Sequence, residues 1–133
     1  MIDYKGIKIS CNHKIIPFKG YVAINFFGVL LTRMNDVDMI NYLGTERGKI
    51  LINHERIHVL QKEKLHSWLL FYILYLWYWA KMYFVTFNNK MAYKTIPFEI
   101  EAYGYETDME YKKSYWESFK LKNKERKKFY NIK

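Results

Sequence analysis

The chain has 133 residues, of which 50% are hydrophobic and one, Cys11, is a cysteine. This length suits a core of about one domain, and a single cysteine excludes an intramolecular disulfide and a cysteine-rich zinc finger. The net charge of +9 suits phosphates or anionic lipid headgroups, but no nucleic-acid-binding module accompanies it, so nucleic acid is disfavoured as a partner.

The N-terminal part, from Gly6 to about Arg33, predicts β-structure. Short apolar runs rich in Val, Ile, Phe and Tyr alternate with turn residues, which predicts two to four strands, FFGVLLTR being the clearest. The start MIDYKGIKIS lacks the apolar core of a secretory signal, so the expected compartment is the cytoplasm. A polar connection, NDVDMINYLGTERG, follows, and its DVDMINYL portion is compatible with a short helical turn.

A helical pattern without Gly or Pro begins at Lys49 and contains INHERIHVLQ. His54 and His58 lie four residues apart, so on a helix both imidazoles share one face and can reach one ion. Glu55 projects away from both, where it can accept a proton from a metal-bound water. Gln61 returns to the histidine face and can orient a ligand or face a substrate. An exposed polar helix is the alternative, but the apolar residues on both sides favour a metal site.

The segment from Trp68 to Phe87 is strongly apolar. As a helix it would measure about 30 Å, the thickness of a bilayer core. Lys81 interrupts the apolar run, and the many Tyr and Trp residues are typical of cores and interfaces. We expect a core helix packed against the histidine-bearing helix and the helix that follows it. Association with a membrane surface and a membrane span are the alternatives.

A further helix is predicted from Pro97, because proline suits the first turn of a helix. Its sequence is PFEIEAYGYETDMEYKKSYWESF, in which Gly104 weakens the middle, so two shorter helices are an alternative to one. Some zinc sites combine two histidines with a glutamate. Glu99 and Glu101 both offer a carboxylate here, and they point to nearly opposite sides of the helix.

With H-E-x-x-H at residues 54–58 and a glutamate on a later helix, the sequence resembles the gluzincin metallopeptidases. The stretch EIEA, residues 99–102, is similar to the start of the E-x-x-A-D signature of the CAAX-processing branch, although Tyr103 replaces the aspartate. The pieces IIPFKGYVAINFFGV, HERIHVLQ and AYKTIPFEIEAYGYE also resemble small single-domain zincin-like proteins of Bacteroidetes. This second resemblance extends from about Ile15 to Tyr111.

The resemblance implies a Zn²⁺ ion held by His54, His58 and Glu99, with Glu55 as the general base. Glu101 competes with Glu99 for the third position. The implied reaction is hydrolysis of a peptide or protein substrate by metal-activated water. A zinc-binding interaction protein without hydrolysis is one alternative, and a peripheral membrane-binding protein with a structural metal is the other.

The expected fold is α+β: a minimal zincin-like domain in which a small N-terminal sheet precedes three or four helices. One domain is expected over residues 1–133, with a basic C-terminal tail at about 120–133 that forms a solvated helix end or binds phosphates or anionic lipids. Tyr103, one turn after Glu99, is expected to orient a ligand or donate to an oxyanion, with a core tyrosine as the alternative. The strand FFGVLLTR is expected to be an edge strand that aligns an extended peptide.

Overall fold

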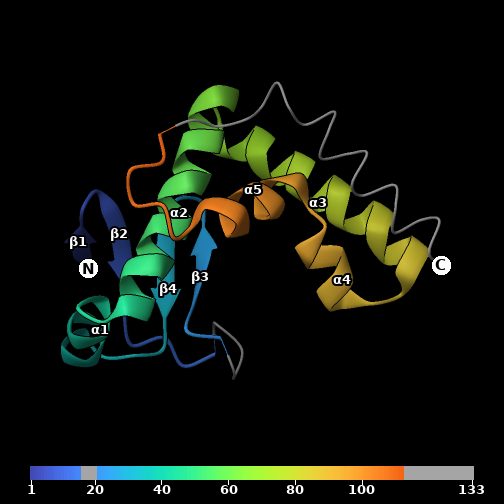
Figure 1. The fold of residues 1–133 in the computed structure, drawn as a ribbon. Helices are drawn as coiled ribbons and strands as arrows, with labels where there is room; N and C mark the ends of the chain where they lie inside the picture. The colour runs from blue at the N-terminus through green and yellow to red at the C-terminus, as the bar shows by residue number, and fades with distance from the viewer. Residues whose placement is uncertain (16–20, 113–133) are drawn as a thin grey trace. The chain divides into compact units, whose positions relative to one another are not determined.

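The computed structural model describes residues 1–15 and 21–112, so the predicted basic tail and the last part of the predicted final helix lie outside the described residues. Within these ranges the chain forms four strands followed by five helices, which confirms the α+β class (Figure 1). The elements are β1 (Ile2–Tyr4), β2 (Ile7–Ser10), β3 (Ala23–Phe26), β4 (Val29–Thr32), α1 (Asp36–Leu43), α2 (Glu46–Leu65), α3 (Trp68–Thr86), α4 (Asn89–Lys94) and α5 (Pro97–Tyr105).

The chain divides into two compact units, Met1–Arg56 and Ile57–Lys133, and the boundary falls inside helix α2. The first unit contains the sheet, α1 and the first part of α2. The second contains the remainder of α2 together with α3, α4 and α5. The single domain expected over the whole chain stays a prediction.

The sheet of the first unit is mixed, with the strand order β1-β2-β4-β3. β1 pairs with β2 and β3 with β4 in antiparallel hairpins, whereas β2 and β4 run parallel. Two-residue turns close both hairpins, and all four turn residues have positive φ, from 49° to 89°. Such left-handed pairs match the twist of the flanking strands, and they occur here at Lys5-Gly6 and Phe27-Gly28.

The prediction that FFGVLLTR forms an edge strand is wrong. The turn at Phe27-Gly28 divides this run, and only Val29–Thr32 forms a strand, which lies between β2 and β3. The interior position agrees with the complete burial of Leu30. Among the described strands, β3 lies at this edge of the sheet instead.

The buried apolar side chains of the first unit come from the sheet and from α1, and they include Ile9, Leu30, Met39 and Leu43. The entry into α2 requires Gly48, since a Cβ atom there would lie 2.1 Å from the Tyr42 carbonyl oxygen. This close approach explains a glycine inside the first turn of a long helix, where glycine is otherwise unfavourable.

Helix α2 begins at Glu46, three residues before the predicted start at Lys49. The Thr45 hydroxyl caps it by accepting a hydrogen bond from the Gly48 amide, 3.1 Å away. The helix continues without interruption to Leu65, so the two histidines lie on one continuous element.

Aromatic stacking organises the second unit. The Phe98 side chain of α5 is fully buried, and its ring stacks on Phe71 of α3 with the centroids 4.5 Å apart. Tyr75 and Tyr78, also on α3, lie with their ring centroids 6.5 Å from that of Phe98. The predicted packing of α3 against the last helix is confirmed on this face. Helix α4 was not predicted, because its NKMAYK sequence was interpreted as a connection.

Replacing Phe98 with alanine is expected to lower the free energy of unfolding by about 3–5 kcal/mol, because the substitution leaves a cavity among the rings of α3. Urea denaturation followed by circular dichroism measures the change. Phe84→Ala is the matched control, because Phe84 is 70% exposed and its loss is expected to change stability by about 0.5 kcal/mol or less. Equal effects of the two substitutions would contradict the described packing.

Helix α3 is the one element, among the residues that the structure describes, whose length and apolar composition would allow it to cross a membrane. Only 11% of its most apolar stretch is buried. Phe71 and Met82 face the interior, whereas other large apolar side chains of the helix are exposed. The expectation of a core helix is therefore met on one face only. Lys81 is exposed, as expected for the lysine that interrupts the apolar run.

Candidate metal centre

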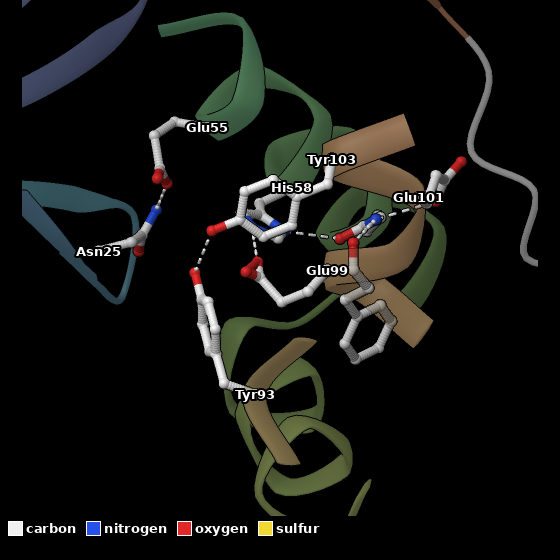
Figure 2. A network of polar contacts seen from close by, with 9 residues as sticks. Asn25, Glu55, His58, Tyr93, Glu99, Glu101 and Tyr103 are labelled. Carbon is white, nitrogen blue, oxygen red and sulfur yellow. Dashed lines mark hydrogen bonds and ion pairs between the residues drawn. The ribbon is translucent and has the colours of Figure 1, made fainter. Parts of the chain in front are cut away.

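His58 is held between two polar partners in the second unit. Its Nδ1 lies 2.8 Å from the Gln61 side-chain oxygen, and its Nε2 lies 2.5 Å from Glu99 Oε1. Figure 2 shows the His58 ring and the Glu99 carboxylate pointing toward one another from α2 and α5. Both side chains are buried. The two atoms that a metal would use, an imidazole nitrogen and a carboxylate oxygen, are therefore already directed to one point.

Gln61 determines which nitrogen of His58 carries a proton. The Gln61 Nε2 group donates to the Phe98 carbonyl oxygen and to Glu101 Oε1, both at 2.9 Å. Since both partners are acceptors, the amide oxygen must be the atom that faces His58. It accepts from Nδ1–H, and this arrangement leaves Nε2 as the nitrogen available for a metal. The prediction that Gln61 returns to the histidine face is confirmed.

Glu101 lies two residues after Glu99 on α5 and contacts Gln61. Its carboxylate accepts hydrogen bonds from the Gln61 amide and from the Tyr111 hydroxyl, and it is completely buried. Two donors directed at one buried carboxyl group fix its orientation. Glu101 thus holds Gln61 in place, whereas Glu99 is the carboxylate that faces the histidine.

The position of Glu99 follows from the start of α5. Pro97 lies in the first turn of the helix, where backbone N–H groups have no partner within the helix, so the lack of an N–H costs no hydrogen bond. Glu99 follows in the same turn. The Gln61 bond to the Phe98 carbonyl attaches the backbone beside Glu99 to helix α2. One glutamine therefore positions both His58 and the segment that bears Glu99.

Two tyrosine hydroxyls lie close to Glu99. The hydroxyl oxygens of Tyr93 and Tyr103 are 3.2 Å apart (Figure 2). Burial raises the pKa of the Tyr93 phenol far above its usual value, and the Glu99 charge and hydrogen bonds to Glu99 and Tyr103 raise it further. Tyr93 therefore stays protonated as a donor. Tyr103 is 45% exposed, so the alternative of a core tyrosine does not hold.

His54 lies one turn before His58 on the continuous helix α2, so the helix alone places both imidazoles on one face. One ligand atom from each of His54, His58 and Glu99 lies within 4.8 Å of the others, and all three residues are buried. Two imidazoles and a carboxylate form a donor set that zinc binds in proteins. The described residues that the sequence predicted as metal ligands therefore fit a zinc ion chemically.

Glu55, in the first unit, accepts a hydrogen bond from the Asn25 side-chain amide at 2.8 Å (Figure 2). Asn25 lies on β3, and its side chain also accepts from the Gly28 amide in the following turn. This second bond fixes the amide orientation, so the NH₂ group faces the carboxylate. Glu55 is 7% exposed, and a neutral amide donor orients it without forming an ion pair.

Three residues of these networks were not predicted from the sequence: Asn25, Tyr93 and Tyr111. Asn25 could have been recognised as a candidate, because it is a polar residue between the apolar residues Ile24 and Phe26 in a short predicted strand. The tyrosines carried no comparable signal among the 13 of the chain. The histidines left out of the site also lie apart: His13 bonds to the Ser10 hydroxyl, and His66 follows α2 with an exposed side chain.

Comparisons of the chain with protein-family models, with curated proteins and with solved structures found no match.

Gln61→Ala is expected to weaken zinc binding by about 10–100-fold, because it removes the partner of His58 Nδ1 and the link to the segment bearing Glu99. Isothermal titration with zinc measures the dissociation constant. Gln61→Glu keeps an acceptor for Nδ1 but places a second carboxylate beside Glu101, so it is expected to bind zinc more weakly than the native chain as well. Native affinity in Gln61→Ala would show that this hydrogen bond does not position the ligand.

Proposed function

We propose that the protein is a zinc-dependent peptidase of the gluzincin type. The observation that carries this proposal is the convergence of His54, His58 and Glu99, which are separated in sequence yet offer ligand atoms within 4.8 Å of one another. The position of Glu55, directly after the first histidine, adds the base that such a reaction requires. The resemblance to gluzincins supports the same roles.

When bound, zinc would polarise the scissile carbonyl and lower the pKa of a coordinated water toward about 7. Glu55 accepts the proton of the attacking water and passes it to the leaving amine. The Asn25 amide orients the Glu55 carboxylate through Oε2. Tyr93, kept protonated by its surroundings, holds the Tyr103 hydroxyl at 3.2 Å. Tyr103 supplies a hydroxyl donor for the oxygen that becomes negatively charged.

A peptide or protein in the cytoplasm is the proposed substrate. The second candidate is a zinc protein without hydrolytic activity, and one observation favours it: the exposed fractions of His54, His58 and Glu99 are only 6%, 5% and 1%. Structural zinc sites are closed, whereas catalytic sites keep a coordination position open for water. The two candidates share the ligands and differ in the role of Glu55.

The direct test incubates the zinc-loaded full-length chain with unfolded casein and with a peptide library of mixed sequence. Mass spectrometry of newly formed amino termini detects cleavage. The peptidase proposal expects termini that appear with zinc, vanish after chelation and return when zinc is restored. A protein shown to contain one zinc per chain that generates no termini in either substrate would support the non-hydrolytic candidate instead.

A further inference from the structure

Helix α3 exposes a continuous apolar stripe. Leu69, Ile73, Leu76, Trp77 and Phe84 are 62%, 56%, 62%, 58% and 70% exposed, respectively. Their spacings of four, three, one and seven residues place them on one side of a helix. The described part of the helix therefore presents several large apolar side chains in a row, which is unusual for a surface that meets only water.

The opposite side of the same helix is fixed by packing within the second unit. Phe71 and Met82 are buried, and Phe71 stacks on Phe98 of α5. The Trp79 indole donates to the Asn89 side chain at the start of α4. Because α3 is anchored on this side, the described packing leaves the stripe on the other side of the helix.

The charged residues in the sequence around the stripe all have one sign. Residues 64–98 contain no Asp or Glu and carry four lysines, Lys64, Lys81, Lys90 and Lys94, all of which are exposed. The Lys81 ammonium lies 5.8 Å from the Trp77 ring centroid. Segments that contact lipid headgroups are often rich in lysine, tryptophan and tyrosine. In such segments the aromatic ring lies at the membrane interface and the lysine ammonium reaches the phosphates.

We propose that α3 binds the surface of an anionic lipid membrane, lying in the plane of the interface with the stripe immersed. Apolar burial and attraction between lysines and anionic headgroups act together in such binding. A transmembrane orientation is disfavoured, because the anchored side of α3 packs on α5, whose Glu99 and Glu101 would then enter the hydrocarbon region at high cost. The proposal does not depend on the proposed peptidase activity.

The test is flotation of the full-length chain with vesicles of phosphatidylcholine alone or mixed with phosphatidylglycerol. Binding is expected to the mixed vesicles and to weaken as salt rises. The double substitution Ile73→Glu with Leu76→Glu is expected to lower the bound fraction about tenfold or more, since it places two charges in the stripe. Val37→Glu with Ile40→Glu is the matched control, because these residues of α1 are also exposed and apolar, at 67% and 56%.

Circular dichroism establishes that both double variants fold. If the stripe variant does not fold, quenching of tryptophan fluorescence by brominated lipids in the native chain and in Trp77→Phe provides a second readout. The proposal expects Trp77→Phe to lose most of the quenching. The proposal is overturned if the native chain does not bind vesicles, or if the control variant loses as much vesicle binding as the stripe variant. It is also overturned if quenching persists in Trp77→Phe, or if sedimentation shows dimers that depend on the stripe while no lipid binding is found.

Discussion

His58→Ala is expected to reduce zinc affinity by more than about 100-fold, which exceeds the effect of losing a residue that only supports a ligand. Both ring nitrogens of His58 have a partner in the site: Nε2 faces Glu99, and Nδ1 donates to Gln61. Alanine removes the imidazole and leaves a buried carboxylate and a buried amide with one contact fewer. Metal analysis after dialysis and titration calorimetry measure the loss.

The matched control for this substitution is His66→Ala. His66 follows the same helix but is exposed, so its removal is expected to leave zinc content unchanged. Glu99→Gln provides a second variant with little change in shape, and it is expected to weaken binding because a neutral amide replaces the carboxylate. Native zinc content in His58→Ala, with a native circular dichroism spectrum, would remove His58 from the ligand set.

Glu55→Gln is expected to retain zinc and the fold while losing hydrolysis by about 10²–10⁴-fold. Glutamine has the shape of glutamate, and its side-chain oxygen can still accept the hydrogen bond from Asn25. It cannot take a proton from water, however, so only the chemical step is affected. Release of casein fragments by matched amounts of zinc-loaded native and variant protein gives the ratio.

Glu63→Gln is the control here, since Glu63 lies on the same helix with an exposed side chain, and its activity is expected to equal that of the native chain. Two outcomes would contradict the role given to Glu55. Loss of zinc in Glu55→Gln would make Glu55 a ligand, and undiminished cleavage would show that another group accepts the proton.

The placement of His54 and His58 on one face could be predicted from sequence because that geometry is local, whereas the choice of Glu99 as third ligand rested on a resemblance to a known family. The 3.6-residue repeat of a helix places the His54 and His58 side chains on the same face. The same repeat gives the Glu99 and Glu101 side chains different directions from the helix axis. Gln61 belongs to that pattern too, which is why its return to the histidine face was predictable. Its bonds to α5 were not, since they join residues nearly 40 positions apart.

The errors in the fold prediction have a common physical origin. The run FFGVLLTR has strong strand propensity throughout, yet the turn at Phe27-Gly28 places only its second half in β4. Strand propensity reports local preference and contains no information on which strands become neighbours. The position of β4 inside the sheet depends on its parallel pairing with β2, a contact between segments about 20 residues apart.

The stripe on α3 shows another limit of sequence patterns. The helix is apolar nearly all round, and such composition is typical both of helices buried in a core and of helices in contact with lipid. Sequence alone therefore could not determine which side would be covered. Packing determines it, because Phe71 meets Phe98 whereas Ile73 and Trp77 remain exposed.

Anomalous X-ray scattering from crystals of the zinc-loaded chain, recorded on both sides of the zinc absorption edge, tests the central claim most directly. We expect one peak per chain, within bonding distance of an imidazole nitrogen of His54, Nε2 of His58 and a carboxylate oxygen of Glu99, at about 2.0–2.2 Å. A peak bound by other residues, or none beside His54 and His58 in protein that contains one zinc per chain, would contradict it.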